Sequence, residues 1–273
     1  SENKNSNLTT PGVASSTVGQ INAQPNVISP TQSSNGTSVT SAVASSTSLQ
    51  TNAQPTQIAL PQPSNEVKQI NSQLSSTKIN SNANETFQAS PGEFKFSVTL
   101  SSDKVSVISD DNGKTWKISS SQYGVDTLIG FHRIQLSDKS IALDFAKGDS
   151  GYGAATMIGA AFGKSYIATY FGAAVSLFDN GKSRNDISKL IVDNKFIESV
   201  VGPTNEAWVK HVYKNVVGVD PDPFTLAAYA ALLSDGTYTR TSLLTLASEV
   251  PLIETQIDLA GLQTKGLSYA GLL

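Results

Sequence analysis

The first ninety residues constrain the fold of this chain more than any other feature. Ser, Thr, Asn, Gln, Ala and Pro dominate residues 1–90, and the only aromatic residue there is Phe87. Three acidic and three basic side chains cancel, so the segment has no net charge. Such a composition cannot bury enough apolar surface to offset backbone ordering, which costs about 1–2 kcal/mol per residue. We therefore expect a polar, extended N-terminal arm.

The arm contains a duplication with an offset of 30 residues. Val13–Asn35 and Val43–Asn65 agree at 14 of 23 positions, including the ASST and NAQP segments. Two copies fall short of a solenoid, which needs at least three. The arm can be a flexible linker or stalk. Alternatively, it can add a strand to the sheet edge of a neighbouring copy.

Composition excludes several classes of protein. The formal charge of −3, the pI near 5.4 and only three Arg leave no basic field for nucleic acid. The absence of Cys removes disulfides, thiolate catalysis and Cys-ligated metals. Apolar runs are too short for a transmembrane helix, so we expect no membrane span.

Residues 91–148 follow a strand pattern. Pro91-Gly92 marks a boundary, and Phe94, Phe96, Val98 and Leu100 then alternate with polar residues. Asp111-Asn-Gly-Lys114 is a strong turn signal. The pattern predicts a small antiparallel β-sheet of four to six strands.

Two motifs in and after this segment are typical of enzymes. Ser109–Trp116 fits S-x-D-x-G-x-T-W, which resembles the Asp-box repeat of sialidase-type propellers. It occurs once, whereas a propeller needs several blades, so we interpret it as a structural hairpin.

The second motif, Gly148-Asp-Ser-Gly151, resembles the nucleophile segment of trypsin-like proteases. His132 lies too close in sequence for the double barrel of such a protease, and His211 belongs to a helix. We interpret the motif as a glycine-rich turn from sheet to helix, and the two isolated His as no metal site.

Residues 149–273 predict an α-helical bundle of short helices. Trp208, Val209, Val212, Tyr213, Val216 and Val217 form one apolar face between the N-cap Thr204 and Gly218. Asp222-Pro223 starts the next helix, which Asp235-Gly236 ends. Thr239 caps a third helix, which stops at Pro251.

A helical hairpin occurs twice in this region. Leu177–Ile197 aligns with Leu232–Ile253 when one residue is inserted, so that Gly181 pairs with Gly236 and Arg184 with Arg240. Each copy reads as a helix, a Gly stop, a hydroxyl cap and a second helix. Duplication and convergent capping are both open explanations.

The second copy resembles the DUF4214 domain of bacterial secreted and surface proteins. The matching residues are Tyr213, Asn215, Val216, Gly218, Asp222, Leu226, Leu233, Gly236, Thr239, Arg240, Ser248 and Glu249. Val219 and Phe224 replace the usual Arg and Gly. Upstream, Val125–Phe145 resembles a strand unit that precedes such domains in type I-secreted proteins. The resemblance covers roughly residues 125–273. It implies an extracellular location, often calcium-associated partners, and no catalytic activity.

These observations predict an α+β protein with three parts: an arm over 1–90, an antiparallel β unit over 91–148 and a helical DUF4214-like domain over 149–273. We expect no catalytic or cofactor-binding residues. Calcium is possible, with Asp138, Asp220 and Asp222 as candidate ligands. The expected function is a non-enzymatic extracellular subunit of a filament, sheath or surface layer. Its arm would link neighbouring copies into a homo-oligomer or polymer. The alternative is a secreted cell-surface adhesin or calcium-associated binding module with the arm as a flexible stalk.

Overall fold

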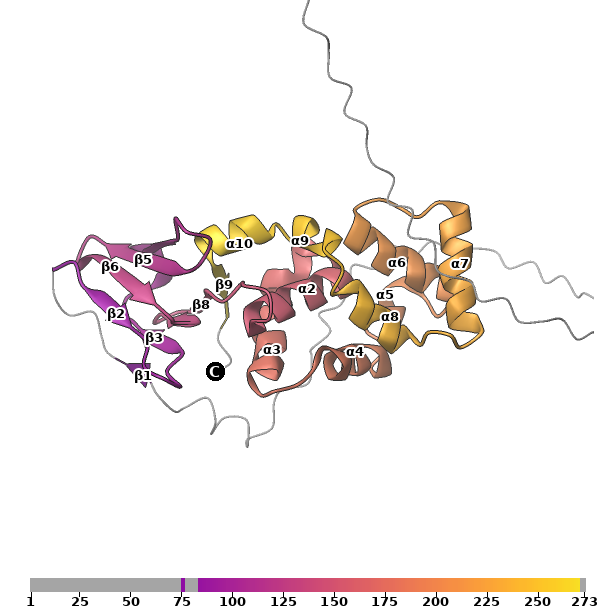
Figure 1. Ribbon diagram of the computed structural model, residues 1–273, viewed down its shortest axis with the longest axis horizontal. Coiled ribbons are helices and arrows are strands. Elements are labelled where there is room, and N and C mark those ends of the chain that lie inside the picture. The colour runs from indigo at the N-terminus through magenta and orange to yellow at the C-terminus, as the bar shows by residue number, and fades with distance from the viewer. Residues whose placement is uncertain (1–74, 77–82, 271–273) are drawn as a thin grey trace, which may run out of the picture. The chain divides into compact units, whose positions relative to one another are not determined.

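The computed structural model describes residues 75–76 and 83–270, which form an α+β fold as the sequence predicts (Figure 1). The strands are β1 Ser75–Ser76, β2 Thr86–Gln88, β3 Lys95–Ser97, β4 Ser106–Ile108, β5 Thr115–Ser120, β6 Gly124–Ile129, β7 Arg133–Gln135, β8 Ser140–Ala142 and β9 Leu267–Tyr269. The α-helices are α2 Ser150–Phe162, α3 Ile167–Asp179, α4 Arg184–Asp193, α5 Glu198–Val201, α6 Asn205–Val217, α7 Pro223–Ser234, α8 Arg240–Ala247, α9 Leu252–Gln256 and α10 Leu259–Lys265. Two 3₁₀ helices are η1 Ser102–Lys104 and η2 Lys164–Tyr166.

The strands of the described residues make two sheets, and both are mixed where the sequence predicted antiparallel pairing. One sheet has the order β1-β3-β7-β8-β9 and the other has the order β2-β6-β5-β4. Neighbours joined by short turns, such as β5 with β6 and β7 with β8, are antiparallel. The pairs β1-β3, β3-β7 and β2-β6 are parallel. Parallel partners need long connections, so local turn signals could not predict them.

The end of the predicted arm belongs to the sheets. Residues 1–74 and 77–82, which include the 30-residue duplication, lie outside the described residues. The Glu85 amide donates to the Asp126 carboxylate at 2.9 Å, and the Phe87 ring packs 5.0 Å from that of Phe96. The β unit therefore begins before the expected boundary at Pro91.

Sheets and helices have separate hydrophobic clusters. Phe96, Trp116 and Ile118 are buried in the sheet cluster, as the alternating pattern predicts. Met157, Phe171, Trp208 and Leu244 are among the buried residues of the helical cluster. No helix in the described part of the chain combines the length and apolar character needed to cross a membrane.

The helix ends follow the predicted capping chemistry. The Thr204 hydroxyl accepts from the Ala207 amide, and the Asp222 carboxylate accepts from the amides of Phe224 and Thr225. Ser183 and Thr239 each form a capping box. These side chains satisfy amides that the first turn of a helix leaves without intrahelical partners.

The duplicated hairpin is part of a larger repeat, in which α2–α5 corresponds to α6–α9. Counterpart helices begin at Ser150 and Asn205, Ile167 and Pro223, Arg184 and Arg240, and Glu198 and Leu252, which are 55, 56, 56 and 54 residues apart. Each unit therefore has two long helices followed by two shorter ones in the same order. The predicted repeat captured only the middle of this unit.

The two units contact each other through equivalent elements. Helix α2 contacts its counterpart α6, and α4 contacts its counterpart α8. In addition, α2 contacts α9 while α6 contacts α5. Reciprocal contacts of this kind are typical of an isologous pair related by an approximate two-fold axis.

Candidate functional site

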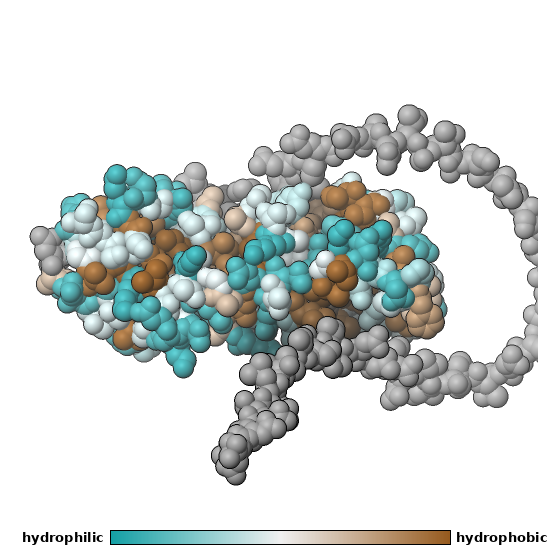
Figure 2. Space-filling model, turned by 90° about the horizontal axis from the view of Figure 1, so that it is seen from above, coloured by the Kyte–Doolittle hydropathy of each residue, from teal (hydrophilic) through white to brown (hydrophobic). Residues whose placement is uncertain are grey.

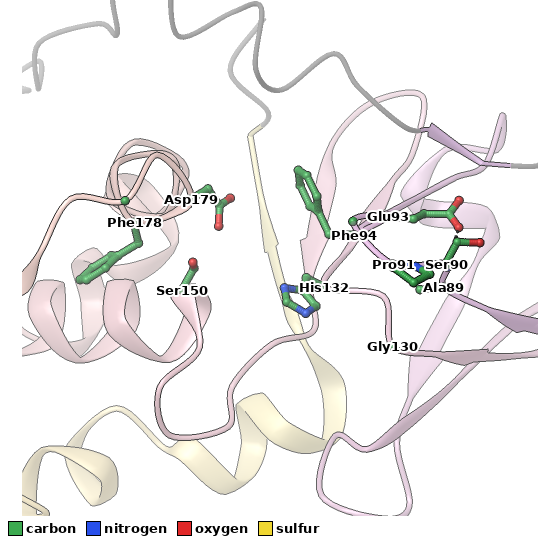
Figure 3. A pocket seen from close by; sticks show the side chains of 12 residues that line it. Ala89, Ser90, Pro91, Glu93, Phe94, Gly130, His132, Ser150, Phe178 and Asp179 are labelled. Atoms are coloured by element: carbon green, nitrogen blue, oxygen red, sulfur yellow. Dashed lines mark hydrogen bonds between the residues drawn. The ribbon is translucent and has the colours of Figure 1, made fainter.

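A pocket of about 600 Å³ lies between the loops of the sheets and the helices α2 and α3 (Figure 3). Ser150, Phe178 and Asp179 line its helical side, and Pro91, Glu93 and Phe94 line the opposite side, with His132 between them. The His132 side chain is 49% exposed, so it can contact a molecule in the pocket. The pocket has room for a small molecule.

A buried ionic cluster adjoins the pocket and is centred on Arg133. Arg133 is only 2% exposed, and its Nη1 donates to the Asp144 carboxylate. Its Nη2 lies 3.1 Å from Asp179 Oδ1 and 3.2 Å from Oδ2. Strand β7, the loop after β8 and the C-terminal end of α3 are joined through this one side chain. Hydrogen bonds between ionised groups, as here, are shorter and stronger than those between neutral groups.

Asp144 is the second centre of the cluster. Burial raises the pKa of the Asp144 carboxyl, while the Arg133 guanidinium and the Gly151 amide oppose the rise. The Gly151 amide donates to Asp144 Oδ2 at 3.0 Å. The carboxylate therefore lies at the N-terminal end of α2, where the helix dipole stabilises negative charge. No motif in the sequence indicates that Arg133, Asp144 and Asp179 form a cluster. The only available signal was that the first two belong to the strand unit Val125–Phe145.

The Gly148–Gly151 motif is the turn from sheet to helix that the sequence predicts. Gly148 has φ +105°, and Asp149 Oδ2 accepts from the Ala146 amide at 2.9 Å. A Cβ at Gly151 would lie 2.4 Å from Asp144 Oδ1, so only glycine allows this close approach. Asp144 Oδ2 lies 3.9 Å from His132 Nδ1, which is beyond hydrogen-bond distance. The motif therefore positions Asp144 under the start of α2.

The Asp-box segment forms a hairpin turn, as predicted. Asp111 Oδ1 accepts from the Thr115 amide at 2.8 Å, and Oδ2 accepts from the Thr115 hydroxyl at 2.7 Å. These bonds lower the pKa of Asp111 to about 2. Trp116 Nε1 donates to the Gly113 carbonyl at 3.1 Å, which places its indole under the turn.

The two other arginines occupy equivalent places in the repeat. The Arg184 guanidinium lies 5.5 Å from the Tyr152 ring centroid, and that of Arg240 lies 6.0 Å from Trp208. Arg184 Nη1 donates to the Thr156 hydroxyl at 2.8 Å. Arg240 Nη2 donates to the Asn205 side chain at 2.9 Å. Each arginine ties the third helix of its unit to the first helix, which is an architectural role.

His211 lies between the two units. Its Nε2 lies 2.9 Å from the Ala161 carbonyl oxygen at the end of α2. Burial lowers the pKa of the His211 imidazole, which favours its neutral form. The residue therefore packs against the first unit.

The three candidate calcium ligands lie apart and have protein partners. Asp138 accepts from the Ser102 amide and hydroxyl at 2.8 and 2.7 Å. Asp220 pairs with Lys210 at 3.1 Å and with Lys214 at 3.2 Å. Asp222 caps α7. Within the described residues, no group of three or more His, Cys, Asp or Glu side chains is arranged to hold a metal ion.

Comparison with known proteins identifies one domain. Residues 187–249 match the model of DUF4214, a family described as a domain of unknown function. The match begins within α4 and ends just after α8, so it spans parts of both units. It confirms the resemblance over these residues. No curated protein and no solved structure matches the chain.

Proposed function

We propose that this chain, which carries a DUF4214 domain at residues 187–249, is a non-enzymatic extracellular structural protein. It is the self-assembling subunit of a filament, sheath or surface layer. Its N-terminal arm links neighbouring copies into a homo-oligomer or polymer.

The observation that carries this proposal is how the chain enters the sheets after the arm. Strand β1 pairs with β3 at one edge of the five-stranded sheet. Strand β2 pairs with β6 at one edge of the other sheet. Each is a short, parallel, added edge strand. Main-chain pairing of this kind depends little on side chains, so a polar arm can use it with a neighbour as well.

The state of the polar side chains also supports a non-enzymatic role. Arg133 and Asp144 are bound to each other, and Arg184 and Arg240 each cross-link helices within the bundle. Catalysis requires groups that converge on a reacting atom and are free to exchange protons there. The charged groups of the Arg133 cluster are instead bound to one another and hold the sheet against the helices.

The experiment compares the full chain with a variant that lacks residues 1–74 and so retains β1 and β2. Light scattering across a concentration series and negative-stain microscopy measure assembly, while circular dichroism confirms that both proteins are folded. We expect concentration-dependent assembly of the full chain and a monomer for the deletion variant. A full chain that stays monomeric, or a variant that assembles equally well, contradicts the proposal.

The pocket favours a second candidate function. A secreted cell-surface adhesin or calcium-associated binding module, with the arm as a flexible stalk, would use the pocket beside His132 for a polar ligand. Equilibrium dialysis of the full chain against calcium tests the calcium version. Retention of one calcium ion per chain favours this candidate, and no uptake counts against it.

A further inference from the structure

Helix α7 has an apolar surface that the rest of the described chain leaves open. Its sequence, PFTLAAYAALLS, has no charged residue, and among its twelve residues only Ala230 is buried. Phe224 is 83% exposed, and Ala227 and Ala231 on the same side are exposed as well. We call the face formed by these three residues the α7 face. A helix that is apolar all round is normally buried, so the α7 face lacks a partner.

The inner side of α7 is already occupied. The Tyr229 ring lies 6.5 Å from the ring of Tyr213 on α6, and the Asn205 side chain donates to the Ser234 hydroxyl at 3.1 Å. Apolar side chains also gather on the molecular surface at the end of the helical part that contains α6 and α7 (Figure 2). The packing of α7 is therefore one-sided.

The internal repeat indicates what kind of partner fits. The counterpart of α7 is α3, and at the offset of 55 residues that relates Gly181 to Gly236, Gly172 corresponds to Ala227 and Ser176 to Ala231. Gly172 and Ser176 are buried, whereas Ala227 and Ala231 are exposed. The same helix face is thus covered in the first unit and open in the second.

A strand covers α3 at this place. Strand β9 contacts α3, and a Cβ at Gly172 would lie 2.9 Å from the Ala270 carbonyl oxygen. The Tyr269 ring lies 5.1 Å from the Phe171 ring. The covering segment, Leu267-Ser268-Tyr269, alternates large apolar residues with a small one. Small residues on the helix let the backbone of an extended segment approach closely.

We propose that the α7 face binds the arm of a neighbouring copy through the segment Gln57–Leu60 in extended form. This inference rests on the proposed function. Ile58-Ala59-Leu60 has the same apolar, small, apolar order as β9, and Pro55 and Pro61 flank the segment. Proline lacks an amide donor and is suited to the ends and edges of strands.

Charge and length are compatible with this occupant. Residues 49–65 carry no charge, and neither does α7, so the contact buries no unpaired ion. Leu60 lies fifteen positions before Ser75, where β1 begins. A chain of this length spans up to about 50 Å, which is enough to reach beyond its own domain.

The absence of Cys in the chain permits a direct test by disulfide cross-linking. Full-length A227C with an affinity tag is mixed with untagged full-length L60C and oxidised, and I58C is tested in the same way. Because each protein carries one Cys, a tagged-to-untagged product forms only between copies. Two controls are A260C, at an exposed alanine of α10, and S38C, elsewhere in the arm.

We expect A227C to capture L60C or I58C at least about tenfold more than the control pairs do. Equal capture by the controls overturns the inference, as does a product that forms only within one copy in the double variant A227C/L60C. Light scattering on the same samples separates the two proposals. Assembly without the specific cross-link refutes the α7 contact alone, whereas a chain that never assembles refutes the proposed function and, with it, this inference.

Discussion

Arg133 binds Asp179 through Nη2, which lies 3.1 and 3.2 Å from the two carboxylate oxygens. The two residues are 46 positions apart in the chain, and one belongs to a strand while the other ends a helix. The same guanidinium also contacts the buried Asp144 carboxylate. A single cation therefore bridges two acidic groups at the junction of sheet and helix.

We expect Arg133→Met to lower the free energy of unfolding by about 3–5 kcal/mol, because it leaves the Asp144 carboxylate buried without its partner. Urea denaturation followed by circular dichroism measures the change. Lys189→Met is a suitable control, because it removes an exposed pair with Asp193 and should cost less than about 0.5 kcal/mol. Similar losses in the two variants would show that the cluster does not hold the junction.

If the Gly148–Gly151 motif is a structural turn, the glycine matters more for stability than the serine that would be the nucleophile in a protease. Gly151→Ala should destabilise the protein by about 1–3 kcal/mol, because the new Cβ overlaps Asp144. Ser150→Ala should change stability by no more than about 0.5 kcal/mol, since Ser150 lies at the rim of the pocket. Thermal denaturation of both variants tests this order, and a larger loss for Ser150→Ala would refute it.

Asp111 predicts a pH dependence at the β4–β5 turn. Its pKa in the folded state is lowered from 3.8 to about 2, first of all by the hydrogen bond from the Thr115 amide. A lowered carboxyl pKa means that the stabilisation is complete above pH 3.8 and is lost as the pH falls through about 2. An NMR titration of the Asp111 carboxyl carbon should find a midpoint near 2.

Thr115→Ala is the matched control for this titration. It removes the hydroxyl donor to Asp111 but keeps the amide, so the Asp111 midpoint should rise and remain below 3.8. An unchanged midpoint would mean that the hydroxyl does not contribute to the shift.

Ala227→Glu tests the α7 face through assembly. A charge placed on this face must be desolvated when a partner binds, so we expect assembly to require at least about tenfold more protein. Sedimentation velocity gives the concentration dependence, and circular dichroism confirms that the helix is retained. Ala260→Glu adds the same charge to α10 and should leave assembly unchanged. If both variants assemble like the parent protein, the α7 face is not an interface.

The parts of the fold that depend on neighbouring residues could be predicted from sequence. Ser183 and Thr239 cap their helices because a hydroxyl needs to reach only the third amide ahead. Phe96 and Trp116 are buried because alternation along a strand assigns side chains to a face.

What sequence reasoning missed depends on long-range contacts. The parallel pairing of β2 with β6 joins residues about 41 positions apart, and no local signal specifies it. The cluster of Arg133, Asp144 and Asp179 likewise forms only after sheet and helix have packed together. The three candidate calcium ligands were predicted because they are acidic residues in turns: Asp138, Asp220 and Asp222. Carboxylates in turns also accept hydrogen bonds, cap helices and form ion pairs, and these three have such partners.

If the chain assembles through its arm as we propose, the order of the five-stranded sheet has a mechanical consequence. Strand β1, next to the arm, and strand β9, next to Ala270, form the two outer edges of that one sheet. Tension applied between the arm and Ala270 is therefore carried sideways, from ladder to ladder, through the hydrogen bonds of β3, β7 and β8. Both helical units lie in the chain between β8 and β9, which are hydrogen-bonded neighbours in the sheet. The sheet can therefore bear the load while the helices keep their packing.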